Sequence, residues 1–353
     1  MYATACIQLG TLFSEDDLSI KKLSENLTVS FINGITIARQ LVIKSNAKFR
    51  KILRKAIESE QQIYDCEDEK TSRIYTRFAR NVNRNVIRYL ASLSILFIQF
   101  CVIPAITDPV EIQVNNNRTK LVRALPLPLW FPFDQQKHYT MTYFLDLLNC
   151  CIAGGFLTCT DLLMVIMIAY PLGQLKIVQT NLENFEIFKR KFRYDGKMNA
   201  HLAFIEIIKK HYDVIEYIND FNDIMALVAL IDFLQSSIQV ACVFTQILGS
   251  KVTFFTVGLV FSFFMSMIVR VFLYYYYANK VTSLSLDLAY SIWTCNWYEQ
   301  PTEVIFMMRM FIMRCQKPLN FKIGSFGVMS MQAFLSVLRA TYSYMMLMYG
   351  VSK

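Results

Sequence analysis

Residues that could carry out catalysis or hold a metal are few and scattered along this chain. The three histidines, His138, His201 and His211, form no HExxH or HxxxH pair, and the nine cysteines include no CxxC. Zinc sites and hydrolytic centres need such ligands at short, regular spacings. No paired carboxylates or nucleophile motif stands at a plausible site either. We therefore expect no enzyme, no cofactor and no metal, and several cysteines lie in apolar runs as small hydrophobic residues.

Charges inside otherwise apolar runs are more informative. Asp146 and Asp161 interrupt residues 139–172, Arg270 lies toward the inner end of 253–278, and Arg339 lies in the middle of 326–349. A charge in the middle of a bilayer costs about 2.5–3.5 kcal/mol on insertion scales, so it needs water, a partner or an interface. We expect Arg270 either to pair with Asp161 or to snorkel, and Arg339 either to face a pore or subunit contact or to snorkel.

The overall composition places the chain in a membrane. It has 353 residues, 54% of them hydrophobic, with a mean hydropathy of +0.34 and only 11 Gly and 8 Pro. We therefore expect one all-α, polytopic protein in contact with membrane lipid, rather than several soluble domains. The net charge of +9 then concerns topology and not nucleic acid.

Long apolar runs predict where the chain crosses the bilayer, because about 20 apolar residues span its hydrocarbon core. The runs that could form the spans are 27–43, 86–107, 139–172, 225–248, 253–278 and 326–349. Residues 1–13 are apolar but too short to span, and we expect them to be the tail of an incomplete first helix. The sequence thus predicts a seven-helix protein whose first helix is partial.

Basic residues set the expected orientation. Residues 46–88 hold many Lys and Arg in one connecting loop, which the positive-inside rule places in the cytoplasm. Counting spans from that loop puts the C-terminus outside, the inverse of a G-protein-coupled receptor. The two N-x-S/T sequons, at Asn26 and Asn117, fall on loops that this count puts outside. The tyrosine run 274–277 would then lie at the inner interface, as an aromatic belt rather than a ligand cage.

The segment before the last span differs in kind. Residues 304–315 are apolar but too few to span, so they predict a buried helix outside the bilayer. We expect this helix to be buried against neighbouring subunits, with Met308 and Phe311 at the contact. The chain then divides into a transmembrane part with a ligand-binding outer half (1–278), a cytoplasmic anchor segment (279–325) and a last helix with a short outer tail (326–353).

A pocket for a small and mostly apolar ligand that arrives from outside is expected in the outer half of the bundle. Such pockets are lined by aromatic and aliphatic side chains with one or two hydroxyl groups. Tyr143 is the first choice, since its ring supplies contact area and its hydroxyl a hydrogen bond. The expected ligand-binding residues are Phe31, Ile35, Phe97, Phe100, Cys101, Tyr139, Tyr143 and Phe144. The alternative is that these side chains only pack helices or anchor at the outer interface.

Short motifs along the chain resemble those of one family. The C-terminal part contains Tyr290-Ser291-Ile292-Trp293, Gln316-Lys317-Pro318-Leu319, Gly324-Ser325-Phe326 and Tyr342-Ser343-Tyr344. Together they resemble the C-terminal signature of insect odorant receptors. The proline-rich stretch LPLPLWFPFD, which ends at Asp134, looks like the second extracellular loop of the same family.

The resemblance implies a function. Members of that family are tuning, odorant-binding subunits of a heteromeric, ligand-gated, non-selective cation channel in olfactory neurons, assembled as a tetramer with a co-receptor subunit. Mapping the pore constriction by the Ser-Tyr motif places Leu347 and Val351 at it, with Ala340 and Tyr344 below. Leu347 could instead be ordinary lipid-facing surface. The alternatives in function are a G-protein-coupled chemosensory receptor or a related gustatory receptor channel.

Overall fold

The computed structural model describes residues 20–65, 69–106, 110–114, 118–127, 129–194, 197–248, 254–325 and 327–351. Residues 1–13, expected to be a partial first helix, lie outside this set. The long helices are α2 (Ile20–Ser45), α3 (Ala47–Asp65), α4 (Glu69–Ile106), α5 (Tyr139–Glu183), α7 (Ala200–Leu248), α8 (Phe254–Trp293) and α10 (Met331–Val351). The shorter elements are β1 (Val110–Val114), β2 (Arg118–Val122), α6 (Phe185–Phe188), η1 (Lys189–Lys191), β3 (Arg193–Tyr194), β4 (Lys197–Met198), η2 (Trp297–Glu299), α9 (Thr302–Cys315), β5 (Lys322–Ile323) and β6 (Gly327–Val328).

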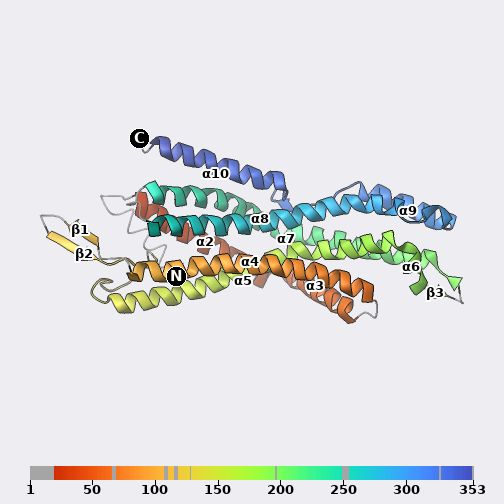
Figure 1. Cartoon of the computed structure of the whole chain (residues 1–353), viewed down its shortest axis with the longest axis horizontal. Helices are drawn as coiled ribbons and strands as arrows, with labels where there is room; N and C mark the ends of the chain where they lie inside the picture. Colours follow the sequence, from red (N-terminus) through yellow and green to blue (C-terminus); the bar gives the residue numbers. More distant parts are fainter. Residues whose placement is uncertain are drawn as a thin grey trace.

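The helices run side by side along the long axis of the molecule (Figure 1). The antiparallel β1–β2 hairpin lies at one end, which we call the hairpin end, and α6, β3 and α9 lie at the other, which we call the α9 end. The helix α10 lies along one side of the bundle, with its C-terminus at the hairpin end. The all-α fold expected from the sequence is thereby confirmed, with short two-stranded hairpins as its other elements in the described part.

Several helices are longer than the spans expected from the sequence. Residues 46–88, expected to be a basic loop, are instead α3 and the first half of α4. The break between α2 and α3 falls at Asn46, whose side-chain oxygen accepts a 2.9 Å hydrogen bond from the Lys48 amide and caps α3. Likewise α5 runs on to Glu183, α8 runs on to Trp293, and α7 joins an amphipathic stretch and a span in one helix. Helices therefore continue beyond the lengths that a bilayer requires.

The last span begins later than expected. The described residues 327–330 do not extend the helix, and α10 starts at Met331. Its 21 residues correspond to about 31 Å of helix, still the thickness of a hydrocarbon core. The helix α9 forms over Thr302–Cys315, which confirms the expected short helix before it.

Length and composition mark three helices of the described part as able to cross a membrane. They are α4, α5 and residues 257–293 of α8. One sequon does not fit its expected place: Asn26 lies within α2, is buried, and accepts a hydrogen bond from Ser30. An asparagine buried in a helix is a poor glycosylation acceptor, so this sequon gives no support to the orientation. Asn117 lies outside the described residues.

Two glycines allow close approaches that position the helices. A Cβ atom at Gly173 of α5 would come within 2.8 Å of the rings of Tyr75 and Phe78, so only glycine lets α4 pack this tightly. Gly324, with φ of +55°, forms the turn between β5 and β6 and lies against Leu230 of α7. Its amide donates a 2.8 Å hydrogen bond to the carbonyl of Ala226 and ties the turn to α7.

The link between α9 and α10 is held by side chains of α7 and α8. Asn222 donates to the Asn320 carbonyl at 2.9 Å and accepts from the Lys322 amide at 2.8 Å. Ser285 accepts from the Leu319 amide, and Thr282 donates to the Leu319 carbonyl, both at 3.0 Å. The motif residues 316–325 therefore fix where α10 leaves the bundle.

Candidate functional site

The structure brings three of the expected ligand-binding residues together near the hairpin end. Tyr143 of α5 donates a hydrogen bond to the backbone carbonyl of Cys101 in α4. The ring of Tyr139 lies 5.9 Å from that of Tyr143, and its hydroxyl donates to the Ala124 carbonyl at 3.0 Å. These tyrosine hydroxyls therefore join α5 to α4 and to the segment that follows β2.

Phe100 connects two apolar clusters at the same end of the bundle. It packs on a cluster of Val260, Phe263 and Met267 in α8, and on a second cluster formed by Leu127 and Leu129. Leu127 and Leu129 belong to the segment of residues 122–138, which we call the β2–α5 segment. This segment therefore covers the hairpin end of α4 and α5.

The other expected residues are dispersed. Ile35 of α2 is buried in the main core, and Phe97 is half-buried on α4. Phe31 and Phe144 are 38% and 64% exposed and do not point into a shared core. The eight residues therefore lie in one region without forming one wall.

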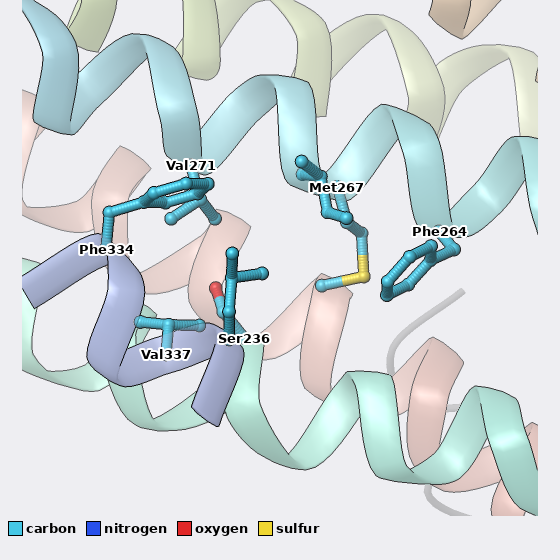
Figure 2. A pocket seen from close by; sticks show the side chains of 8 residues that line it. Ser236, Phe264, Met267, Val271, Phe334 and Val337 are labelled. Carbon is cyan, nitrogen blue, oxygen red and sulfur yellow. The ribbon is translucent and has the colours of Figure 1, made fainter. Parts of the chain in front are cut away.

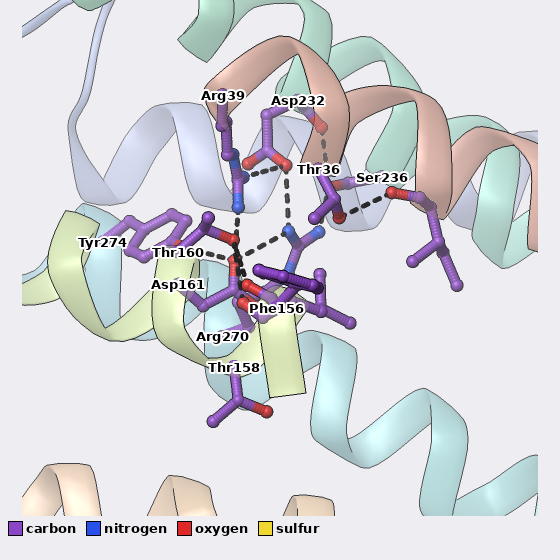
Figure 3. A network of polar contacts seen from close by, with 12 residues as sticks. Thr36, Arg39, Phe156, Thr158, Thr160, Asp161, Asp232, Ser236, Arg270 and Tyr274 are labelled. Atoms are coloured by element: carbon purple, nitrogen blue, oxygen red, sulfur yellow. Dashed lines mark hydrogen bonds and ion pairs between the residues drawn. The ribbon is translucent and has the colours of Figure 1, made fainter. Parts of the chain in front are cut away.

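A buried cluster of four charges joins four helices in the interior of the bundle (Figure 3). Arg39 of α2 forms ion pairs with Asp161 of α5 and, at 2.6 Å, with Asp232 of α7. Arg270 of α8 lies 2.9 Å from Asp232 and 3.7 Å from Asp161. The two positive and two negative charges balance, so the cluster can be buried without a net charge. The expected Arg270–Asp161 pair is present, but its closer partner is Asp232, which sequence reasoning did not single out.

Hydroxyl groups complete this charge network. Tyr89 of α4 and Tyr274 of α8 donate hydrogen bonds to Asp161 at 2.7 Å and 2.9 Å. Ser236 accepts from Arg270 at 3.2 Å and donates to the Asp232 carbonyl at 2.7 Å. We call these seven residues the charge network: Arg39, Tyr89, Asp161, Asp232, Ser236, Arg270 and Tyr274. The network gives α2, α4, α5, α7 and α8 a common set of polar contacts.

The tyrosine run 274–277 differs from the aromatic belt expected from sequence. Tyr274, Tyr275 and Tyr277 are buried, with 2–4% of their surface exposed. Tyr274 bonds to Asp161, and Tyr277 accepts a 2.9 Å hydrogen bond from Asn85. These rings pack inside the chain, because α8 is surrounded by α4, α5 and α7 at this level.

The charge network reaches the side of the bundle against which α10 packs. A small apolar recess lies between α7, α8 and α10, and Ser236 is its polar member (Figure 2). Phe334 and Val337 of α10 line it and are 8% and 4% exposed. The first turns of α10 are thus fixed to the bundle next to the network.

The expected pore residues lie on α10. Ala340 is half-buried, and Arg339 is exposed on a neighbouring position of the helix. Tyr344, Leu347 and Val351 fall within the helix, but their side chains lie outside the described part of the structure. Their role at a constriction stays a prediction.

The expected assembly residues lie inside the chain's own core. Met308 and Phe311 of α9 are 2% and 4% exposed, and the ring of Phe311 lies 4.8 Å from His211 and 5.9 Å from Phe204 of α7. Burial, helped by the nearby Arg314, lowers the pKa of His211 to about 4. These two positions are thus occupied by contacts within the subunit, which the short apolar run alone did not indicate.

A comparison of the sequence with known protein families covers all of the regions described above. A family model described as 7tm Odorant receptor matches residues 19–342. The chain belongs to the odorant receptor family. The resemblance inferred from its C-terminal motifs is thereby confirmed.

Relatives of this odorant receptor include insect proteins of moderate similarity. It is 25% identical to Odorant receptor 10 of Aedes albopictus over 294 residues, which make up 81% of this chain and 72% of that one. It is also 25% identical to Odorant receptor 67c of Drosophila melanogaster over 223 residues, which make up 62% and 54% of the two chains.

The fold of this odorant receptor matches a solved structure. The insect olfactory receptor OR5 of Machilis hrabei, in complex with eugenol, superposes with a TM-score of 0.77 at 14% identity. The match covers 99% of this chain and 86% of that one. At such identity the likeness concerns the fold alone.

Proposed function

We propose that this odorant receptor is the odorant-binding tuning subunit of a heteromeric, ligand-gated, non-selective cation channel in the plasma membrane of olfactory neurons. The proposal that the protein forms a channel rests on α10, which has an apolar side packed on the bundle and an exposed polar side. Phe334 and Val337 pack it against the bundle, whereas four exposed polar residues follow one another at spacings of four, three and four. This polar stripe consists of Gln332, Ser336, Arg339 and Ser343.

A polar stripe along a membrane-length helix is costly against lipid and suits a water-filled pathway. In an assembly of several subunits, each α10 would turn its stripe to the central axis and its apolar side to its own bundle. The exposed charge of Arg339 would then meet water rather than hydrocarbon. Leu347, Val351, Ala340 and Tyr344 would line the same pathway nearer the hairpin end.

A partner subunit has a surface available on α9. Its exposed side is apolar, with Phe306, Met310 and Met313 at 64%, 52% and 60% exposure. This helix is too short to span and lies at the end that we place in the cytoplasm. We therefore assign the co-receptor contact to this face, and assign Met308 and Phe311 on the opposite face to holding α9 in place.

The odorant would enter from the hairpin end, which we place outside the cell. Phe100, Tyr143 and Cys101 lie there together with the buried leucines of the β2–α5 segment. Apolar walls with a few hydroxyl groups suit a small volatile molecule. The eugenol complex of a protein with this fold supports the choice of ligand class.

The first experiment tests the channel. Cells expressing this chain with and without the co-receptor are recorded against an odour panel, and inward current is expected only with both subunits.

Ser336→Cys and Ser343→Cys should make that current sensitive to a hydrophilic thiol reagent, while Leu335→Cys, on the neighbouring exposed apolar side, should not. Equal insensitivity of all three variants would contradict a pore lined by the stripe.

The second experiment tests orientation and the ligand site. An epitope after Lys353 should be stained in unpermeabilised cells, and staining only after permeabilisation would favour the G-protein-coupled alternative. Tyr143→Ala and Phe100→Ala should change the rank order of odorant responses, whereas Met141→Ala, at an exposed position of the same helix α5, serves as the control. An unchanged rank order in both variants at normal surface level would place the ligand elsewhere.

A further inference from the structure

One buried carboxylate near the hairpin end has no side-chain partner. Asp146 of α5 is fully buried, its polar neighbour is the backbone N–H of Leu127, and no described side chain donates a hydrogen bond to either of its oxygens. Thr142, one turn earlier on the same helix, uses its hydroxyl on the His138 carbonyl at 3.1 Å. In this it differs from Asp161 and Asp232 of the charge network, each of which lies against two arginines.

The segment that covers Asp146 is apolar, and aromatic rings pack on it. The backbone of Leu127 lies close to the carboxylate, and Leu127 and Leu129 are 7% and 2% exposed. Phe100, Phe131 and Cys150 pack on these two leucines, and Cys150 lies one turn beyond Asp146. The carboxylate is therefore enclosed between α5 and the β2–α5 segment, beside the expected ligand site.

The chemistry of this place selects a kind of ligand. An ionised carboxylate among apolar walls is costly unless a cation accompanies it. A hard divalent cation such as Ca²⁺ or Mg²⁺ takes six or more oxygen ligands, and Zn²⁺ takes four ligands, mostly His and Cys; no cluster of three His, Cys, Asp or Glu that could hold a metal occurs in the described residues. A single carboxylate with aromatic rings nearby matches an organic ammonium group, which offers hydrogen-bond donors, a positive charge for the rings and a hydrocarbon body for the leucines.

We propose that Asp146 is the charge-recognition residue for odorants that carry a protonated amine on a small hydrocarbon body. The proposal rests on the proposed function, because it places the ammonium group at the odorant site. The hydrocarbon part would lie along Phe100 and Leu129, and Tyr143, one turn from Asp146, would hold α4 against α5 around it. The residue thus determines specificity by charge as well as by shape.

The experiment compares linear alkylamines with alkanols of the same chain length at pH 7.4. In cells expressing both channel subunits, the amines should activate the wild-type receptor at concentrations at least about tenfold lower than the alkanols, as a hydrogen bond to a charged group allows. Asp146→Asn should weaken the response to amines about tenfold to hundredfold and change the response to alkanols less than about threefold. Asp134→Asn, an exposed carboxylate of the β2–α5 segment, is the matched control and should behave as wild type.

A binding measurement separates failure of the inference from failure of the channel proposal. Octylamine should raise the thermal midpoint of the detergent-solubilised wild-type protein and of Asp134→Asn, but not that of Asp146→Asn. If the amine stabilises the wild-type protein and cells give no current, the inference stands and the channel proposal fails. No amine preference in the wild type, or equal loss of amine and alkanol responses in Asp146→Asn, overturns the inference.

Discussion

The charge network and Asp146 place carboxylates of one helix, α5, in opposite situations. Asp161 is buried with two arginines and two tyrosine hydroxyls directed at it, and the network has no net charge. Asp146, four turns earlier, is equally buried, yet no described side chain donates a hydrogen bond to it, and the backbone N–H of Leu127 is its polar neighbour. Burial therefore cannot distinguish a carboxylate that holds helices together from one that is available to a ligand.

What distinguishes the two is the supply of donors from other helices. The network draws its donors from α2, α4 and α8, whose hydrophobic packing brings Arg39, Tyr89, Arg270 and Tyr274 to one place. Asp146 lies where α5 is covered by the β2–α5 segment, and Leu127 and Leu129 bring side chains that cannot donate. Folding alone therefore supplies the side-chain donors of Asp161. For Asp146 such a donor would have to come from a further molecule.

Removing one charge from the network should have the largest effect. Asp232→Asn leaves Arg39 and Arg270 with a single buried carboxylate between them, and an uncompensated buried charge typically destabilises by about 3–5 kcal/mol. We expect severe loss of surface expression and a much lower thermal midpoint in detergent. Asp223→Asn, an exposed carboxylate on the same helix, should change neither quantity. A midpoint equal to wild type in Asp232→Asn would mean that the network does not hold the bundle together.

His211, which is buried against Phe311, extends the comparison to a group that titrates. Its folded pKa of about 4 lies below the ordinary value of about 6.5, so the unfolded chain binds more protons between these two values. Stability should therefore fall as pH drops from about 6.5 to about 4, by up to about 3 kcal/mol from this residue.

The check is the thermal midpoint at pH 7.5 and pH 5.0. The decrease between the two should be smaller in His211→Gln than in wild type, and His201→Gln, an exposed histidine, should keep the wild-type decrease. The same decrease in all three proteins would show that folding does not lower the pKa of His211, which would contradict this prediction.

A solvent-exposed ion pair should contribute less than the network. Lys55 of α3 lies 3.0 Å from Asp213 and 2.8 Å from Glu216 of α7, but its side chain is 44% exposed. Exposed pairs contribute about 0.2–1 kcal/mol, so Lys55→Gln should shift the thermal midpoint only slightly. High salt should reduce even that shift, because ions screen the pair. If Lys55→Gln lowered the thermal midpoint as much as Asp232→Asn does, burial would not explain why the charge network contributes more stability than the exposed pair.

Asp146→Asn should have the smallest effect on stability. The change removes a carboxylate with no side-chain partner, and the amide oxygen of asparagine can still accept from the backbone of Leu127, so the thermal midpoint without ligand should be unchanged or higher. Asp232→Asn and Asp146→Asn exchange the same atoms. A difference in thermal midpoint between them therefore reports the surroundings of the two carboxylates. A strong decrease in the Asp146 variant would indicate that the carboxylate has a structural partner.

The sequence by itself determined the class and much of the architecture of this odorant receptor. Apolar runs of bilayer length require helices, because the backbone of a spanning segment must satisfy its own hydrogen bonds. The short run 304–315 could not span, and it forms α9. The motifs at 316–319 and 324–326 carried the family resemblance, and most of these residues lie in the link that fixes the start of α10. Charges in apolar runs also identified Asp146, Asp161 and Arg270 as residues that need an explanation.

Only the tertiary structure decided how those residues are used. No sequence spacing relates Arg39 to Asp161 or Asp232, since their side chains meet across 122 and 193 residues through helix packing. The same packing buries Tyr274, Met308 and Phe311, which local apolar character had placed at a membrane interface or at a subunit contact. Local sequence determines whether a residue must leave water, because transfer from water depends on the side chain itself. Which group it meets there depends on neighbours from other helices, and those are set by the fold as a whole.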